Sequence, residues 1–238
     1  MTFGMALAMA LTSPRYVTAG YYRNHLYVLL GLNVLATMVA LADPARYALW
    51  PPITAALLSY LGSVLWLYEK AGPGILALLL IAVVALFGAW QAHPAPAHGD
   101  LGSQIVAWLD PATSGLLLGV TMAAMLLGHW YLNTPGMQLV PLRRLVLLMA
   151  VAIALRAMLC ASSAVVIEAA FGTDRLLFLA LRWLSGLIGA LGLCWMTWQT
   201  LKIPNTQSAT GILYVAVSST ILGELTSLLL AGDSVFPL

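Results

Sequence analysis

Seven apolar stretches of about twenty residues recur along this chain, and short polar segments separate them. An α-helix rises about 1.5 Å per residue, so a helix of about twenty residues crosses the roughly 30 Å hydrocarbon core of a bilayer. Hydrophobic residues make up 62% of the 238 positions and charged residues only 8%, against roughly 25% charged in soluble domains. The sequence therefore predicts an integral membrane protein that contacts the lipid bilayer.

The predicted fold is all-α: a polytopic transmembrane helical bundle with seven full spans, in which residues 1–238 form a single transmembrane domain. Helices are expected because backbone groups in hydrocarbon need partners within their own segment, and the alternating pattern of a membrane barrel is absent. Segment 1–11 is apolar but about half a span long, and it lacks the positive n-region of a secretory signal. We expect it to be retained as a short N-terminal helix, which is an eighth span only if it crosses the membrane. The expected spans are 24–42, 48–68, 74–91, 113–133, 145–167, 176–201 and 211–231.

Lys and Arg outside the spans are distributed unequally between the two sides of the membrane. Six of them fall in the segments 13–23, 69–73, 134–144 and 202–210, and two fall on the opposite side. Short cytoplasmic loops retain basic residues, so these four segments are predicted to be cytoplasmic. The predicted outer segments are 43–47, 92–112, 168–175 and 232–238, which places the C-terminus outside.

Small residues recur at helical spacing in two of the spans. Such residues let two helices approach closely, and a groove for a lipid tail, a carotenoid or a quinone is the alternative. The residues are Gly115, Gly119 and Ala123 in one span, and Gly186, Gly189 and Gly192 in another.

Three ionisable residues lie well inside predicted spans: Arg156, Arg182 and Glu224. A charge near the bilayer centre is costly, so such residues face the bundle interior, find partners and often mark function. Arg182 and Glu224 have similar depths on consecutive antiparallel helices, so the two residues could pair directly. That pair is either a structural clamp or a proton or anion relay in which Glu224 titrates.

Arg156 lies near mid-depth and has no obvious partner at that level. Its donors could be satisfied by backbone carbonyls, by Ser162 or Ser163, or by Glu224 from another helix. A bound carboxylate, phosphate or haem propionate is the functional alternative.

The most distinctive local sequence surrounds His129, near the cytoplasmic end of its span. His25 lies at the same side, so two imidazoles could ligate one haem b iron if their helices are neighbours. A quinone or lipid-headgroup site is the alternative, because a ring nitrogen beside basic residues suits a carbonyl or a phosphate. The remaining residues of this candidate site are Tyr131, Asn133, Arg143 and Arg144; in a third interpretation, His129 only anchors its helix at the interface and the arginines only fix orientation.

Other chemistry has little support in the sequence. The loop that carries His93, His98, Asp100 and Asp110 matches no familiar zinc spacing, so no metal site is assigned. Cys160 and Cys194 fall inside spans, where a thiol packs as a small hydrophobe. The net charge of +2 is too small to indicate nucleic-acid binding. No phosphate loop, nucleophile elbow or HExxH helix is present.

These features predict an accessory or anchor subunit of a larger membrane complex, linked to electron transfer, with other membrane subunits as partners. In general shape the chain resembles small multi-span subunits of bacterial respiratory or redox assemblies, an analogy of architecture alone. The Arg-, Ala- and Leu-rich composition fits a bacterial inner-membrane protein. The alternative is a small-solute or ion transporter with a polar path through Arg156, Arg182 and Glu224. An enzyme acting by itself is less favoured, since it needs a water-accessible cavity near His129 or Glu224.

Overall fold

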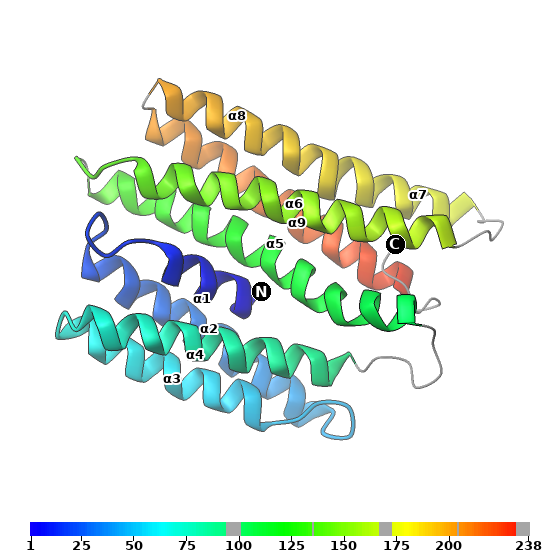
Figure 1. Ribbon diagram of the computed structural model, residues 1–238, viewed down its shortest axis with the longest axis horizontal. Coiled ribbons are helices and arrows are strands. Elements are labelled where there is room, and N and C mark those ends of the chain that lie inside the picture. Colours follow the sequence, from blue (N-terminus) through cyan, green and yellow to red (C-terminus); the bar gives the residue numbers. More distant parts are fainter. Residues whose placement is uncertain (94–100, 135, 167–172, 204, 232–238) are drawn as a thin grey trace.

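The computed structural model describes residues 1–93, 101–134, 136–166, 173–203 and 205–231, and these are helical apart from short turns. Among these residues, seven helices are long and apolar enough to cross a membrane, which confirms the predicted all-α bundle. The segments α7, η1 and α8 follow one another without a break and form a single span, Leu176–Lys202. The elements are α1 (Thr2–Leu11), α2 (Ala19–Ala42), α3 (Trp50–Leu67), α4 (Ala71–Ala92), α5 (Leu101–Asn133), α6 (Val140–Val166), α7 (Thr173–Leu181), the π-helix η1 (Arg182–Gly189), α8 (Ala190–Lys202) and α9 (Thr206–Ala231) (Figure 1).

The first helix is only half a span. Helix α1 has 10 residues, which is about 15 Å of helix against a core of roughly 30 Å. It runs from the middle of the bundle toward the end where α2 begins (Figure 1). Residues 1–11 therefore form the expected short helix, which as it stands is shorter than a membrane span.

Helix α1 lies between two groups of helices, α2 to α4 on one side and α5 to α9 on the other (Figure 1). It packs on α5 backbone to backbone, because a Cβ on Gly119 would lie 2.2 Å from the Met5 nitrogen. A Cβ on Gly4 would likewise lie 2.2 Å from the Gly115 carbonyl oxygen. The small residues of α5 thus serve helix packing, and the groove that they form is filled by α1.

Helix α5 is longer than the sequence predicts. The outer segment 92–112 was expected to be a loop, yet residues 101–112 continue the helix that was expected to begin at residue 113. The expectation was wrong because a segment with His, Pro and Asp residues was taken for a loop as a whole, whereas its second half is helical and Pro111 lies inside the helix.

Side chains satisfy backbone carbonyls near Pro111, which has no N–H to donate. The Thr113 hydroxyl donates to the Leu109 carbonyl at 2.9 Å and to the Asp110 carbonyl at 3.2 Å. The Trp90 indole of α4 donates to the Trp108 carbonyl at 2.9 Å. Three carbonyls that directly precede Pro111 thus accept hydrogen bonds from side chains.

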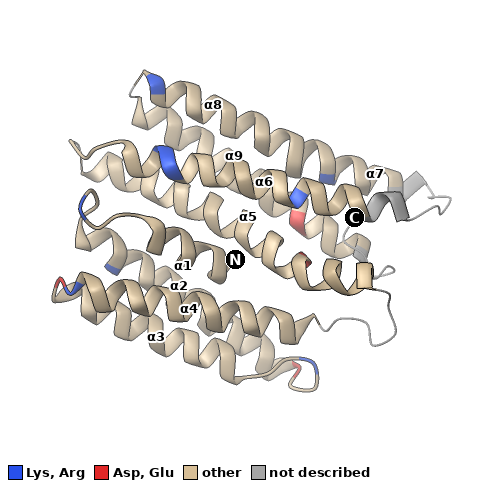
Figure 2. Ribbon diagram, in the orientation of Figure 1, with Lys and Arg blue, Asp and Glu red and all other residues tan. Residues whose placement is uncertain are grey.

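The loops gather at two opposite ends of the bundle (Figure 1). One end, on the left in Figure 2, carries most of the Lys and Arg residues outside the spans, and we call it the basic end. The opposite end carries the α2–α3 turn with Asp43 and Arg46. The residues of the basic end are Arg15, Arg23, Lys70, Arg143, Arg144 and Lys202.

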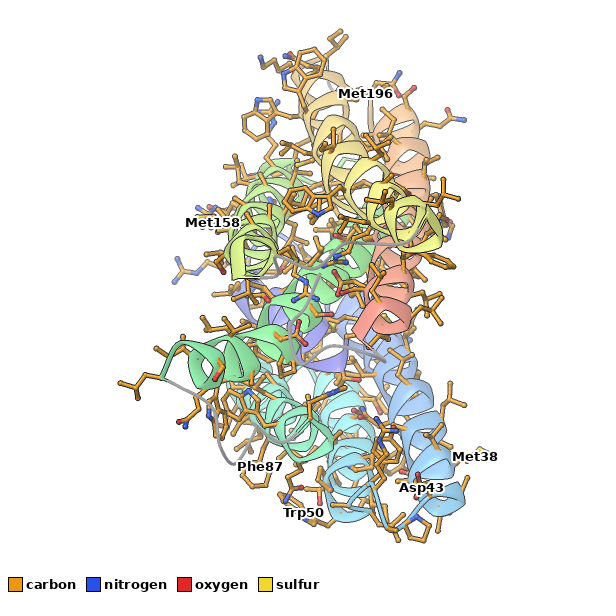
Figure 3. The ribbon with its side chains drawn as sticks, turned by 90° about the vertical axis from the view of Figure 1, so that its right-hand side faces the viewer. Met38, Asp43, Trp50, Phe87, Met158 and Met196 are labelled. Atoms are coloured by element: carbon orange, nitrogen blue, oxygen red, sulfur yellow. The ribbon has the colours of Figure 1, made fainter. Side chains whose placement is uncertain are left out.

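Large apolar side chains cover the outside of the bundle. Met38 of α2, Met158 of α6 and Met196 of α8 all point away from the interior (Figure 3). Water would not solvate such a surface favourably, so lipid acyl chains are its expected surroundings. Within the bundle the buried residues are mainly apolar, and the buried charged residues Arg156, Arg182 and Glu224 define the candidate site.

Candidate functional site

Arg156 of α6 is bound by two carboxylates from two other helices. Only 2% of this residue is exposed. Its Nε and Nη2 donate to the two carboxylate oxygens of Glu224 on α9, at 3.1 and 2.9 Å. Its Nη1 lies 2.5 Å from the Asp110 carboxylate of α5. The planar guanidinium matches the Glu224 carboxylate in the bidentate geometry that gives strong charge-assisted hydrogen bonds.

Arg182, the first residue of η1, is fully buried and binds Glu224 from the other side. Its Nη1 lies 3.3 Å from the Glu224 Oε1 atom and donates to the Gly223 carbonyl at 2.9 Å. Its Nη2 donates to the Cys160 sulfur at 3.0 Å. The pair expected from the depths of Arg182 and Glu224 is therefore present.

The four residues Asp110, Arg156, Arg182 and Glu224 form one connected charge cluster. Two guanidinium groups and two carboxylates give it a formal charge of zero. Four elements contribute to it, namely α5, α6, η1 and α9. Removing one partner of such a buried pair leaves an uncompensated charge, so the cluster ties these helices together.

Glycines bring η1 and α9 close enough to form the cluster. A Cβ on Gly186 would lie 2.6 Å from the Gly223 Cα atom, so the two backbones touch at this crossing. Gly223 directly precedes Glu224, which places both its carbonyl and the carboxylate beside Arg182. One turn away, the Ser219 hydroxyl donates to the Ser185 carbonyl at 2.6 Å. The wide turns of a π-helix often occur at functional sites.

Three members of the site were missed by sequence reasoning because they precede or begin the expected span at residue 113. Asp110 binds Arg156, Thr113 accepts from the Arg156 Nη1 atom at 3.2 Å, and Ser114 donates to the Glu224 Oε2 atom at 2.5 Å. Their spacing of three and four residues places them on one helical face, which was the available signal.

The partners of Arg156 in the structure are the protein's own carboxylates. All three guanidinium nitrogens of Arg156 donate to Glu224 or Asp110. Ser162, one of the partners considered, donates to the Leu159 carbonyl of its own helix. The side chain of Ser163 lies outside the described residues.

The imidazole of His129 lies on the surface near the basic end. Its Nδ1 atom is 3.1 Å from the Tyr214 hydroxyl of α9, and both residues are exposed. The neighbouring Asn133 amide donates to the His129 carbonyl at 3.5 Å. His129, Tyr214 and Asn133 therefore form an exposed polar patch, which we call the His129 patch.

His25 is buried on the other side of α5, among aromatic rings. Its Nδ1 lies 2.6 Å from the Tyr21 carbonyl, so this nitrogen carries the donated proton and the Nε2 atom is left as an acceptor. Its ring centroid lies 6.1 Å from that of Trp130. The two histidines of the haem hypothesis thus have separate sets of contacts, His25 with Tyr21 and Trp130, and His129 with Tyr214.

The other residues of this candidate site mostly contact backbone carbonyls. The Tyr131 hydroxyl donates to the Gln138 carbonyl. The Arg143 Nη2 atom donates to the Leu201 carbonyl at 2.8 Å, at the C-terminal end of α8, where a cation is favoured. Arg144 is exposed.

In the described part of the chain, no group of three or more His, Cys, Asp or Glu residues is placed to hold a metal ion. His98 and Asp100 of the loop considered for metal binding lie outside the described residues. Cys194 is buried and donates to the Val146 carbonyl at 3.3 Å.

The chain was compared with known proteins at the levels of family, sequence and fold. No protein-family model matches it. No curated protein and no solved structure matches it either. The function must therefore be argued from the site itself.

Proposed function

We propose that this protein is an accessory or anchor subunit of a larger membrane complex linked to electron transfer. The observation that supports this proposal is the internal neutrality of the charge cluster. The cluster's carboxylates and guanidinium groups bind one another across α5, α6, η1 and α9. An arrangement of helices that separated these charges would leave them unpaired in the membrane, so the cluster disfavours other arrangements, as a membrane scaffold requires.

The His129 patch is the surface that we assign to a partner or a ligand of that complex. It is polar and exposed, and it lies near the basic end of the bundle. A quinone carbonyl, a lipid phosphate or a haem propionate of a partner can bind an imidazole, a phenol and an amide. Arg144 supplies an exposed cation at the same end. In this proposal the complex lies in a bacterial inner membrane, with the basic end in the cytoplasm and the C-terminus outside.

Native mass spectrometry after extraction in a mild detergent tests the proposal. An affinity-tagged chain is expected to appear with additional subunits, and an absorbance spectrum of the reduced sample reports any haem. A solitary monomer without ligand, obtained under several mild extraction conditions, contradicts the proposal.

A small-solute or ion transporter is the second candidate, and one observation favours it. The Asp110 side chain is 29% exposed, whereas Arg156 and Arg182 are buried. The charge cluster thus forms a hydrogen-bonded chain from a partly exposed carboxylate to the bundle interior, the arrangement of a polar path. Uptake by proteoliposomes of purified protein, compared between the native chain and Glu224→Gln, tests this candidate.

A further inference from the structure

Helix α5 is longer than the membrane is thick. It has 33 residues, which is about 50 Å of helix against a hydrocarbon core of roughly 30 Å. From Asn133 at the basic end, the helix rises about 35 Å to Asp110, so the core has been crossed at that residue. The segment 101–110, which we call the α5 arm, therefore lies at the end of the bundle opposite the basic end.

The α5 arm turns aside from the direction of the other helices. Figure 3 looks along the long axis of the bundle, and there the start of α5 projects sideways from it. In Figure 1 the same start is seen nearly end-on, at the right of the picture. Pro111 directly follows the arm, and a proline inside a helix is the usual cause of such a bend. The arm therefore lies across the end of the bundle instead of continuing along its axis.

The large apolar side chains of the α5 arm share one face and point away from the protein. Each of the four is between 45% and 79% exposed. At 3.6 residues per turn, their positions fall within an arc of about 100° on a helical wheel, the width of an amphipathic stripe. We call this arc the apolar face of the arm, and it consists of Leu101, Ile105, Trp108 and Leu109.

The opposite face of the α5 arm is fixed to the protein by polar contacts. Ser103 is buried, and Asp110 lies seven residues later on the same face. The Asp110 carboxylate binds Arg156, and the Asp110 carbonyl also accepts from the Arg156 Nη1 atom at 3.3 Å. These contacts determine which face of the arm is turned outward.

The apolar face continues the lipid-facing surface of the bundle. Trp108 lies beside Trp90 near the end of α4, with ring centroids 5.2 Å apart. Phe87, about one turn before Trp90, is exposed on the outside of α4 (Figure 3). Indole rings are enriched where the hydrocarbon core meets the headgroups, which is the level at which the arm lies.

The composition of the α5 arm also favours lipid over water or a polar partner. Residues 101–109 include no charged residue. An apolar helix face of this kind is poorly solvated by water, whereas an interfacial helix buries it about 5–10 Å deep at the boundary of headgroups and acyl chains.

We propose that the α5 arm is an interfacial anchor, whose apolar face is seated in the phospholipid headgroup and acyl boundary of the leaflet opposite the basic end. The partner surface is thus a lipid surface, and no other subunit is needed to cover this face. The anchor goes beyond the proposed function and does not depend on it, so the purified chain is sufficient for a test.

Spin-label accessibility in nanodiscs of phosphatidylethanolamine and phosphatidylglycerol tests the proposal. Oxygen concentrates among acyl chains and a neutral nickel chelate stays in water, so the ratio of their effects reports the surroundings of a label. Labels at Ile105→Cys and Leu109→Cys should give ratios between those at Val83→Cys, on the lipid-facing side of α4, and Asp43→Cys, in an exposed turn. The native Cys160 and Cys194 are buried, and the chain without an added cysteine controls for them.

Two results of this measurement overturn the proposal. Ratios at Ile105→Cys and Leu109→Cys equal to the ratio at Asp43→Cys would place the apolar face in water. Protection of both labels from oxygen and from the nickel chelate would show that protein covers the face, either a second copy or a partner.

A matched pair of charged variants separates seating in lipid from a general effect of charge. In the Leu109→Cys chain, Ile105→Glu adds a carboxylate to the apolar face and should shift the label toward the ratio of Asp43→Cys, because a charge resists entry into the membrane. Gln104→Glu adds the same charge at the neighbouring position, which lies outside the apolar face, and should leave the ratio unchanged. Equal shifts in the two variants overturn the proposal.

Discussion

Arg156 and Glu224 are joined by two roughly parallel hydrogen bonds of 3.1 and 2.9 Å, and both residues are buried inside the bundle. They come from α6 and α9, and 68 positions of sequence separate them. Glu224 also accepts hydrogen bonds from Arg182 and from the Ser114 hydroxyl. One carboxylate thus connects α9 with α5, α6 and η1. It is therefore the centre of the charge cluster.

Replacing Glu224 with Gln should destabilise the fold more than any other single change in the cluster. The variant leaves Arg156 and Arg182 buried with only Asp110 as a counter-charge, and breaking a buried ion pair costs about 3–5 kcal/mol. Apparent Tm in detergent and the amount of protein in membranes measure the effect. A variant that accumulates normally, keeps its Tm and loses transport would instead support the transporter candidate.

Asp110→Asn should have a smaller effect in the same direction. Asp110 binds Arg156 through one oxygen and is partly exposed, so we expect a loss of about 1–2 kcal/mol. Asp43→Asn is the matched control, because Asp43 lies in an exposed turn at the same end. Thermal unfolding of both variants compares them, and an equal Tm for the two would argue against Asp110 as a member of the cluster.

Gly119→Ala should loosen α1 from α5. The added Cβ would lie 2.2 Å from the Met5 nitrogen, so the two backbones must separate, at a cost of about 1–3 kcal/mol. Gly31→Ala is the control, since nothing lies within 4 Å of a Cβ there and alanine favours the helix. Unfolding temperatures should fall for Gly119→Ala and stay level or rise for Gly31→Ala.

His129→Ala should weaken assembly without weakening the fold. Both His129 and its partner Tyr214 are exposed, so little buried contact is lost. We expect co-purifying subunits or ligand to decrease in native mass spectrometry, with an unchanged Tm. Tyr60→Ala, on an exposed position of α3, serves as the comparison. Equal co-purification from both variants would remove the His129 patch from the proposed interface.

Much of the fold could be predicted because a helix that crosses the hydrocarbon core must be apolar over about twenty residues. The seven spans follow from the length of the apolar stretches, and the packing of α1 on Gly119 follows the small-residue pattern. The Arg182–Glu224 pair could be predicted because depth in a membrane fixes one coordinate of a residue.

The rest depends on tertiary contacts that no single segment encodes. Asp110 belongs to the cluster only because α5 continues through Pro111, and the neighbouring turn of α5 also contacts another helix through the Trp90 indole. Glu224 binds Arg156 because α6 and α9 bring the two residues together, and sequence periodicity does not specify which helices are neighbours. His25 and His129 lie toward the same end of the bundle, but their rings contact different residues, Trp130 for His25 and Tyr214 for His129.

The half-length of α1 makes the two leaflets unequal for this protein. In one leaflet the seam between the helix groups is sealed by backbone contact at Gly119, and in the other it encloses empty volume. Beyond that volume the two groups meet again, because the Trp90 indole of α4 donates to the Trp108 carbonyl of α5 at 2.9 Å. The seam is therefore closed by backbone contact at one level and by a pair of indole rings at another.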